Sequence, residues 1–189
     1  MRTVTVAANT AVSHYWLSGA IHDFYRQHSN SSLNIRVIFS DHTPDLFNNE
    51  VNLAIAYDTG SRPGWSINEL FVEELFPVAN PDYLRRHSFN DAGPEALLAH
   101  TLLDYERLEP NWINWRVWFD ALNLDTPELK ISRYFNNYIV LLDAAERGLG
   151  VTLGSRYLLD NKLKNGALVR LADFSMHSGR SYYLAANEQ

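Results

Sequence analysis

The sequence predicts an α/β protein built from two small α/β halves, and three observations support this prediction. Short apolar runs typical of strands alternate with segments whose apolar residues recur every three or four positions, as in amphipathic helices. This alternation occurs twice, before and after Pro77. The 189 residues suffice for one domain or for two small ones. Alternating strands and helices favour a largely parallel sheet.

The first half is expected to contain four β segments and two helices. The β segments are expected at residues 3–8, 33–39, 51–57 and 65–79. A helix over 11–28 is predicted from an apolar stripe that steps by four through Val12, Trp16, Ala20 and Phe24. Asn9 or Thr10 can cap this helix, because their side-chain oxygens accept free N–H groups. A short helix is expected near 44–50, after the polar turn SDHTPD.

The second half repeats this order of elements. Strands are expected at 100–105, 129–135, 150–153, 167–171 and 181–186. Helices are expected at about 111–122 and 137–148, the second capped by Asn136 or Asn137 and ended by Gly148. No helix follows the last strand, so this strand can return to the first half. A chain that crosses twice between two lobes places a cleft between them, and helix N-termini at such a cleft favour anions.

The composition excludes several classes of protein. The net charge is −6 and Lys and Arg are scattered, whereas nucleic-acid binders usually carry a basic stripe. The absence of cysteine excludes disulfides, thiolate zinc sites and a cysteine nucleophile. No run approaches the ~18 apolar residues of a membrane helix, and the first residues lack a signal-peptide pattern. We therefore expect a cytoplasmic protein.

Four stretches, in this order and spacing, resemble the effector-binding domain of LysR-type transcriptional regulators. They are WLSGAIHDFYRQHSNSSLNI, DLFNNEVNLAIAYDTG, ELFVEELFPVANPDYL and LLDAAERGLGVTLGSRYLLDNKLKNGALVRL. The last is the most specific, and the spacing is most similar to the glycine-cleavage-activator-like branch. The sequence departs from the family pattern in two places. Glu50, Val51 and Asn52 replace the common Gly-x-Asp, and Ala11 stands where many members have Ser or Thr.

The resemblance implies two Rossmann-like subdomains with a ligand cleft between them, as in type 2 periplasmic binding proteins. Subdomain I would comprise residues 1–77 and 174–189, and subdomain II residues 78–173. The winged helix-turn-helix that this family places before such a domain is absent from this sequence. The implied function is to bind a small metabolite and so control promoter binding by the full-length protein. DNA would be contacted only through the missing domain. The domain would form a homodimer and the full-length protein a tetramer.

Candidate effector-binding residues lie where expected strands meet expected helices. They are Asn9, Thr10, Ala11, Ser13, Ser40, Phe135, Asn136 and Asn137. The free N–H groups and the dipole of the first helix can hold a carboxylate, so a small organic acid or amino acid is the expected ligand. The alternative is that the asparagines and Thr10 are ordinary helix caps and that Ser40 is a turn residue.

No catalytic residue, metal site or cofactor is expected. The seven histidines form neither H-x-x-x-H nor H-E-x-x-H. The run from Gly150 to Gly154 superficially fits a nucleophile elbow, but its Thr152 lies inside an expected strand. The glycines at 148, 150 and 154 follow a helix, whereas a dinucleotide motif follows a strand, so we assign them to packing. Trp112, Trp115 and Trp118 are likewise expected to pack.

Two other functions stay open at this point. A free solute-binding protein of the transport type shares the two-lobed plan. A small α/β enzyme is the third possibility, although the sequence offers no convincing pair of base and nucleophile.

Overall fold

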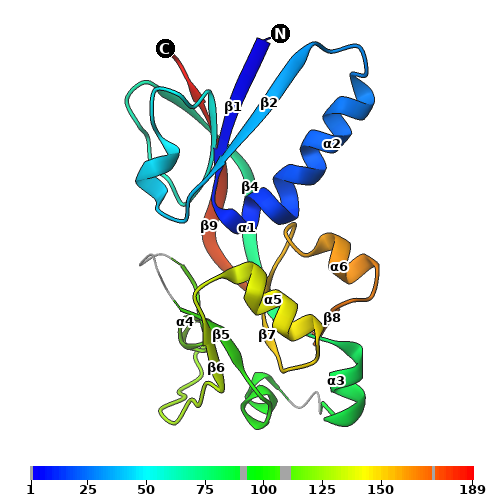
Figure 1. The fold of residues 1–189 in the computed structure, drawn as a ribbon. Coiled ribbons are helices and arrows are strands. Elements are labelled where there is room, and N and C mark those ends of the chain that lie inside the picture. The colour runs from blue at the N-terminus through cyan, green and yellow to red at the C-terminus, as the bar shows by residue number, and fades with distance from the viewer. Residues whose placement is uncertain (1, 90–92, 107–111, 172) are drawn as a thin grey trace. The chain divides into compact units, whose positions relative to one another are not determined.

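The computed structural model describes residues 2–89, 93–106, 112–171 and 173–189 (Figure 1). Its contacts divide the chain into unit 1, residues 1–73 and 179–189, and unit 2, residues 74–178. The chain passes from one unit to the other inside the two longest strands, β4 (Trp65–Ala79) and β9 (Met176–Asn187). The expected division after 77 and before 174 stays a prediction; residue 77 lies inside β4, and residue 174 lies just before β9.

Two adjacent carboxylates at the first boundary have partners in different units. The Tyr57 hydroxyl donates to Glu73 at 2.5 Å within unit 1. Glu74 instead pairs with Arg156 at 3.1 Å and with Arg170 at 3.2 Å within unit 2. Successive side chains of a strand point to opposite faces, so neighbouring residues can belong to different cores.

Unit 1 contains a sheet in the order β2-β1-β3-β9. Strand β1 (Arg2–Ala8) pairs in parallel with β2 (Leu33–Phe39) and β3 (Leu53–Tyr57). Strand β9 pairs antiparallel with β3, which confirms that the last strand returns to the first half. The sheet is therefore mixed. One cluster of buried residues in this unit is small or aliphatic: Ala7, Leu46, Val51, Ala54, Ala56 and Ala185.

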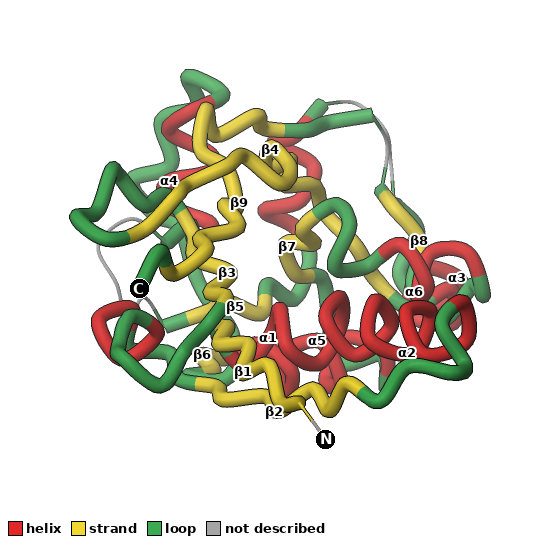
Figure 2. Tube along the Cα trace, turned by 90° about the horizontal axis from the view of Figure 1, so that it is seen from above, coloured by secondary structure: helices red, strands yellow, loops and turns green. Residues whose placement is uncertain are grey.

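The first helix follows β1 directly and is continuous from α1 (Thr10–Val12) through a π-helical turn (Ser13–Leu17) to α2 (Ser18–Gln27). In Figure 2 it is the red segment that leaves β1. Val12 and Leu17 are both buried although they are five residues apart. Because a π turn is wider than an α turn, it brings both side chains to the same face of the helix. The expected stripe from Val12 is confirmed in part, because Trp16, Ala20 and Phe24 are partly buried.

The polar segment after β2 forms a single 3₁₀ turn, Thr43–Leu46, in place of the helix expected near 44–50. Pro44 is at its start, and only Leu46 of this turn is buried. A single buried side chain contributes too little packing to stabilise a longer helix, so the segment forms only one turn.

Unit 2 contains the second half of β4 with two antiparallel neighbours, and a separate parallel pair. These two are β7 (Thr152–Ser155) and β8 (Val169–Arg170). Strand β9 also lies next to β4 in the order of the sheet. The parallel pair is β5 (Leu103–Tyr105) with β6 (Arg133–Phe135). The helices are α3 (Pro81–Arg86), the 3₁₀ helix Pro94–Ala99, α4 (Trp115–Ala121), α5 (Tyr138–Glu146) and α6 (Asp160–Lys164). Of these, the sequence predicted α4 and α5; α4 begins only at Trp115, and α5 is shorter than the expected 137–148.

The tryptophans of α4 form the centre of the unit 2 core, as expected. Trp115 and Trp118 are fully buried. Their indole N–H groups donate to the carbonyl oxygens of Leu103 at 2.9 Å and Leu75 at 3.1 Å. Each ring thus fills the core while its polar atom is satisfied. Part of the expected helix over 111–122 lies outside the described residues.

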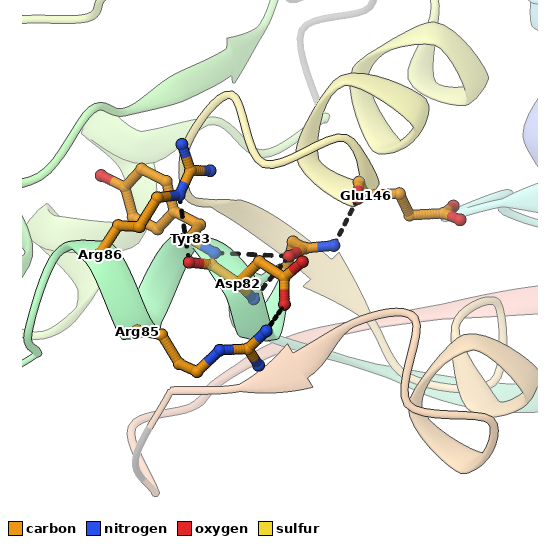
Figure 3. Close-up of polar contacts among 6 residues, drawn as sticks. Asp82, Tyr83, Arg85, Arg86 and Glu146 are labelled. Carbon is orange, nitrogen blue, oxygen red and sulfur yellow. Dashed lines mark hydrogen bonds and ion pairs between the residues drawn. The ribbon is translucent and has the colours of Figure 1, made fainter.

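Helix α3 was not predicted, and its start shows the signal that was overlooked. Asn80 accepts from the N–H groups of Asp82 and Tyr83, the two residues labelled at the start of this helix in Figure 3. Pro81 occupies the first helical position, where its missing N–H costs nothing. The Asn80 amide also donates to the carbonyl of Glu146 at 2.5 Å. One side chain therefore caps α3 and ties it to the end of α5.

The glycines after α5 serve the backbone, as the sequence indicated. Gly148 has φ +76° and ends the helix. At Gly150, a Cβ would lie 2.3 Å from the carbonyl oxygen of Thr101, because the two chains approach closely there. The same approach allows Val151 N–H to donate to Thr101 at 2.9 Å.

We predict that Gly150→Ala lowers the free energy of unfolding by about 1–3 kcal/mol, because the added methyl group must push two backbones apart. Urea denaturation measures this change. Gly19→Ala is the matched control, since its Cβ would meet nothing within 4 Å on an exposed helical position. The control should gain about 0.5–1 kcal/mol. Equal unfolding midpoints for both variants would contradict the prediction.

Candidate functional site

The pairing of β1 with β2 brings the first group of candidate residues together. Ala8 is opposite Phe39 at the carboxyl ends of the two parallel strands. Just beyond them, Ser40 N–H donates to the carbonyl of Ala8 at 3.2 Å. The residues after each strand, Asn9 and Ser40, are therefore neighbours. In α/β sheets the carboxyl edge of parallel strands is the usual place for ligands.

Asn9 caps the first helix, as one of the two sequence readings proposed. Its side-chain oxygen accepts from Val12 N–H at 2.8 Å, and its carbonyl accepts from Ser13 N–H at 2.9 Å. The Thr10 N–H donates to Asp41 Oδ1 at 2.9 Å. The sequence did not predict this partner. Two first-turn N–H groups are thus satisfied within unit 1. Ala11 contributes a partly buried methyl group to the same turn.

Ser13 has the most unusual environment of the candidates. It opens the π-helical turn, and π turns are frequent at functional sites. Its hydroxyl oxygen is buried and has no hydrogen-bond partner in the part of the chain that the structure describes. A buried polar group without a partner costs free energy and requires an explanation. A ligand that supplies the missing hydrogen bond is one such explanation.

Ser40 has the hydrogen bonds of a turn residue. Its hydroxyl donates to Asp45 Oδ2 at 2.7 Å and accepts from His42 N–H at 3.1 Å. These are the local contacts that Ser makes in tight turns. Contact of Ser40 with a ligand stays a prediction.

The second group of candidates lies in unit 2, where β6 runs into α5. Asn137 caps α5, because its side-chain oxygen accepts from Ile139 N–H at 2.9 Å and Val140 N–H at 3.2 Å. Phe135 is partly buried and faces Tyr105 in the pairing of β6 with β5. Asn136 is exposed, and its amide makes no hydrogen bond within the described residues. Of the two asparagines, Asn136 is therefore the one available to a ligand.

A buried carboxylate, Asp104, supports this part of unit 2. It is 4% exposed, at the middle of β5, and accepts from Tyr105 N–H at 3.0 Å and Trp115 N–H at 3.1 Å. Burial raises the pKa of Asp104 to about 6, and the two backbone hydrogen bonds reduce this rise only in part. Asp104 holds the start of α4 against β5, the strand that pairs with β6.

The described residues contain no group of three or more His, Asp or Glu side chains placed to hold a metal ion. Thr152 is 1% exposed inside β7, which leaves it no access to a substrate. None of the helices in the described ranges combines the length and apolar character needed to cross a membrane.

The LysR substrate-binding domain model matches residues 1–189, the whole chain. The chain belongs to this family. It is 26% identical over 169 residues to the glycine cleavage system transcriptional activator homolog of Haemophilus influenzae, covering 89% of this chain and 54% of that protein. It is also 26% identical over 186 residues to the glycine cleavage system transcriptional activator of Escherichia coli K12, covering 98% of this chain and 58% of that protein. This chain thus spans little more than half the length of these relatives.

Solved structures agree on the fold. The effector domain of the regulator AmpR from Pseudomonas aeruginosa matches with a TM-score of 0.74 at 24% identity, covering 99% of this chain and 86% of that one. The regulatory domain of AphB from Vibrio vulnificus matches with a TM-score of 0.71 at 18% identity, covering 98% and 88%. The α/β fold expected from the resemblance is therefore confirmed. This chain is a LysR-type effector-binding domain, and the relatives named here are transcriptional regulators.

We predict that Asp104→Asn changes how stability depends on pH. The folded pKa of about 6 lies above the ordinary 3.8, so this group favours folding fully below pH 3.8. That contribution, at most about 3 kcal/mol at 1.36 kcal/mol per pKa unit, is lost as the pH rises through 6. Asn keeps an acceptor for both N–H groups but does not ionise.

Urea denaturation of both proteins between about pH 4 and pH 7 measures this dependence. The stability of the unaltered protein relative to the variant should fall as the pH rises. A difference that is constant over this range would contradict the prediction.

Proposed function

We propose that this domain senses a small polar metabolite and thereby controls transcription by the full-length regulator in the cytoplasm. The sequence-based expectation of an organic acid or amino acid is the starting point for the ligand class. DNA would be bound through a domain that is absent from this sequence. A ligand controls such a protein only when it binds two arrangements with different affinity.

The observation that carries this proposal is the buried hydroxyl of Ser13, which has no hydrogen-bond partner among the described residues and lies beside the carboxyl ends of β1 and β2. Several polar groups lie together at this edge of the sheet, which is a usual place for a ligand. The chain also belongs to a family of substrate-binding domains. The second group, Phe135 to Asn137, offers the exposed amide of Asn136. We propose that both groups contact the effector.

The two other functions have less support. A free solute-binding protein of the transport type shares the plan of the fold, but the relatives with a printed function are regulators. A hydrolytic enzyme would need an accessible nucleophile, and the one motif that resembled a nucleophile elbow places its Thr152 in the core.

We predict that Ser13→Ala weakens effector binding and leaves the fold intact. A thermal-shift screen of amino acids, amines and small acids identifies the ligand, since a ligand at 100 times its Kd stabilises by about 2.7 kcal/mol. Without ligand, Ser13→Ala should be at least as stable as the unaltered protein, because it deletes an unpaired buried hydroxyl. With ligand, the thermal shift should decrease, corresponding to a loss of about 1 kcal/mol of binding free energy.

Ser18→Ala is the matched control, because the Ser18 hydroxyl donates to the carbonyl of His14 on an exposed part of the same helix. Asn136→Ala tests the second group in the same way. An effector whose thermal shift is unchanged in both Ser13→Ala and Asn136→Ala would place the binding site elsewhere.

We also propose that the domain forms a homodimer, as the resemblance implies, and a tetramer in the full-length protein. Strand β2 is an edge strand of the unit 1 sheet, and its Phe39 is 66% exposed. None of the residues of α2 is buried, although the helix carries apolar residues. Exposed apolar side chains on an edge strand indicate a surface that another chain covers.

We predict that Phe39→Glu converts the dimer to a monomer, because a carboxylate at this position cannot be buried against a second chain without a large cost. Size-exclusion chromatography with light scattering measures the mass directly. Tyr134→Glu is the control, since Tyr134 is 65% exposed but lies on β6 in unit 2. The proposal would be refuted if the unaltered domain had the mass of one chain. It would also be refuted if the Phe39→Glu variant had the mass of two chains.

A further inference from the structure

The turn after β2 carries two carboxylates to the start of the first helix. Asp41 Oδ1 accepts from Thr10 N–H at 2.9 Å, and Asp45 Oδ2 accepts from the Ser40 hydroxyl at 2.7 Å. Both belong to the segment SDHTPD, which has no Lys or Arg. The eight candidate residues contain no Lys or Arg either. With His42 counted as neutral, the formal charge of these residues is therefore entirely negative.

This charge changes what the helix start can bind. The first-turn N–H groups and the helix dipole attract an anion. Here the chain supplies that anion itself, because the Asp41 carboxylate occupies the Thr10 N–H. An incoming carboxylate would have to displace Asp41 or be held beside it, and like charges at short range repel.

We propose that Asp41 sets the ligand class at this position by excluding carboxylates and selecting a protonated amine. The inference rests on the proposed function and narrows its ligand class. Of the two ligands expected from the sequence, an amino acid can meet Asp41 with its ammonium group, where a charge-assisted hydrogen bond forms. A simple organic acid has no such group.

Three variants separate the effect of the Asp41 charge from the effect of its hydrogen bond to the Thr10 N–H. Asp41→Ala removes the carboxylate and frees the Thr10 N–H. Asp41→Asn keeps an acceptor for that N–H and removes the charge. Asp45→Asn is the matched control, because it removes an equal charge from the same turn without touching the helix N–H groups.

The test is a titration of the isotope-labelled domain with two ions of matched size, ethylammonium chloride and sodium acetate, with sodium chloride as the reference for ionic strength. The readout is the amide resonance of Thr10. In the unaltered domain we expect a saturable shift with ethylammonium and none with acetate. In Asp41→Ala we expect the reverse, and in Asp45→Asn the unaltered pattern.

Acetate shifting Thr10 in the unaltered domain as strongly as in Asp41→Ala would overturn the inference, as would the absence of any shift with either ion in both proteins. If Asp41→Ala does not fold, Asp41→Asn decides. It should lose the response to ethylammonium, and a retained response would also overturn the inference.

These outcomes are independent of the test of the proposed function. The two ions report on the start of the first helix even if the metabolite binds elsewhere. Binding elsewhere would be detected by an unchanged thermal shift in Ser13→Ala. Conversely, a simple carboxylate effector whose binding needs Ser13 would support the proposed site and refute the role of Asp41.

Discussion

The parallel pairing of β1 with β2 is the constraint on which the candidate site depends. The register places Ala8 opposite Phe39, so both strands end at the same edge of the sheet. Ala7 and Ala8 are fully buried, which fixes β1 as a central strand. Only with this register can the turn after β2 reach the helix that follows β1 and place Asp41 on the Thr10 N–H. A slip of one residue would reverse every side chain of β2.

Features set by local sequence were predictable, and those set by distant contacts were not. Apolar periodicity located β1, β2 and β4 almost to the residue, and the caps Asn9 and Asn137 were named because a cap bonds to residues two or three positions away. The partner of Thr10 is 31 residues away in the chain, so it depends on the strand register and was missed. Helix α3 was missed because six residues give too short a period to recognise.

Two buried carboxylates of unit 2 show how the neighbouring donors decide a charge state. Burial acts to raise the pKa of Glu74, yet the hydrogen bonds from Arg156 and Ser175 and the charge of Arg170 lower it below its ordinary value. Asp104 is bound by the uncharged N–H groups of Trp115 and Tyr105, and there burial prevails. Glu74 is thus held in its ionised form beside the unit boundary, while Asp104 titrates near the acidic end of the physiological range.

The π-helical turn between Val12 and Leu17 has a consequence for the length of the chain itself. These two buried side chains are five positions apart, whereas a regular α-helix places side chains four positions apart on the same face. The turn therefore accommodates one residue more than the helix requires. A relative that lacks one residue between these positions can close the turn into a regular α-helix and keep the same apolar face inward. We therefore expect this helix to accommodate a change in length of one residue, which a regular helix ordinarily excludes.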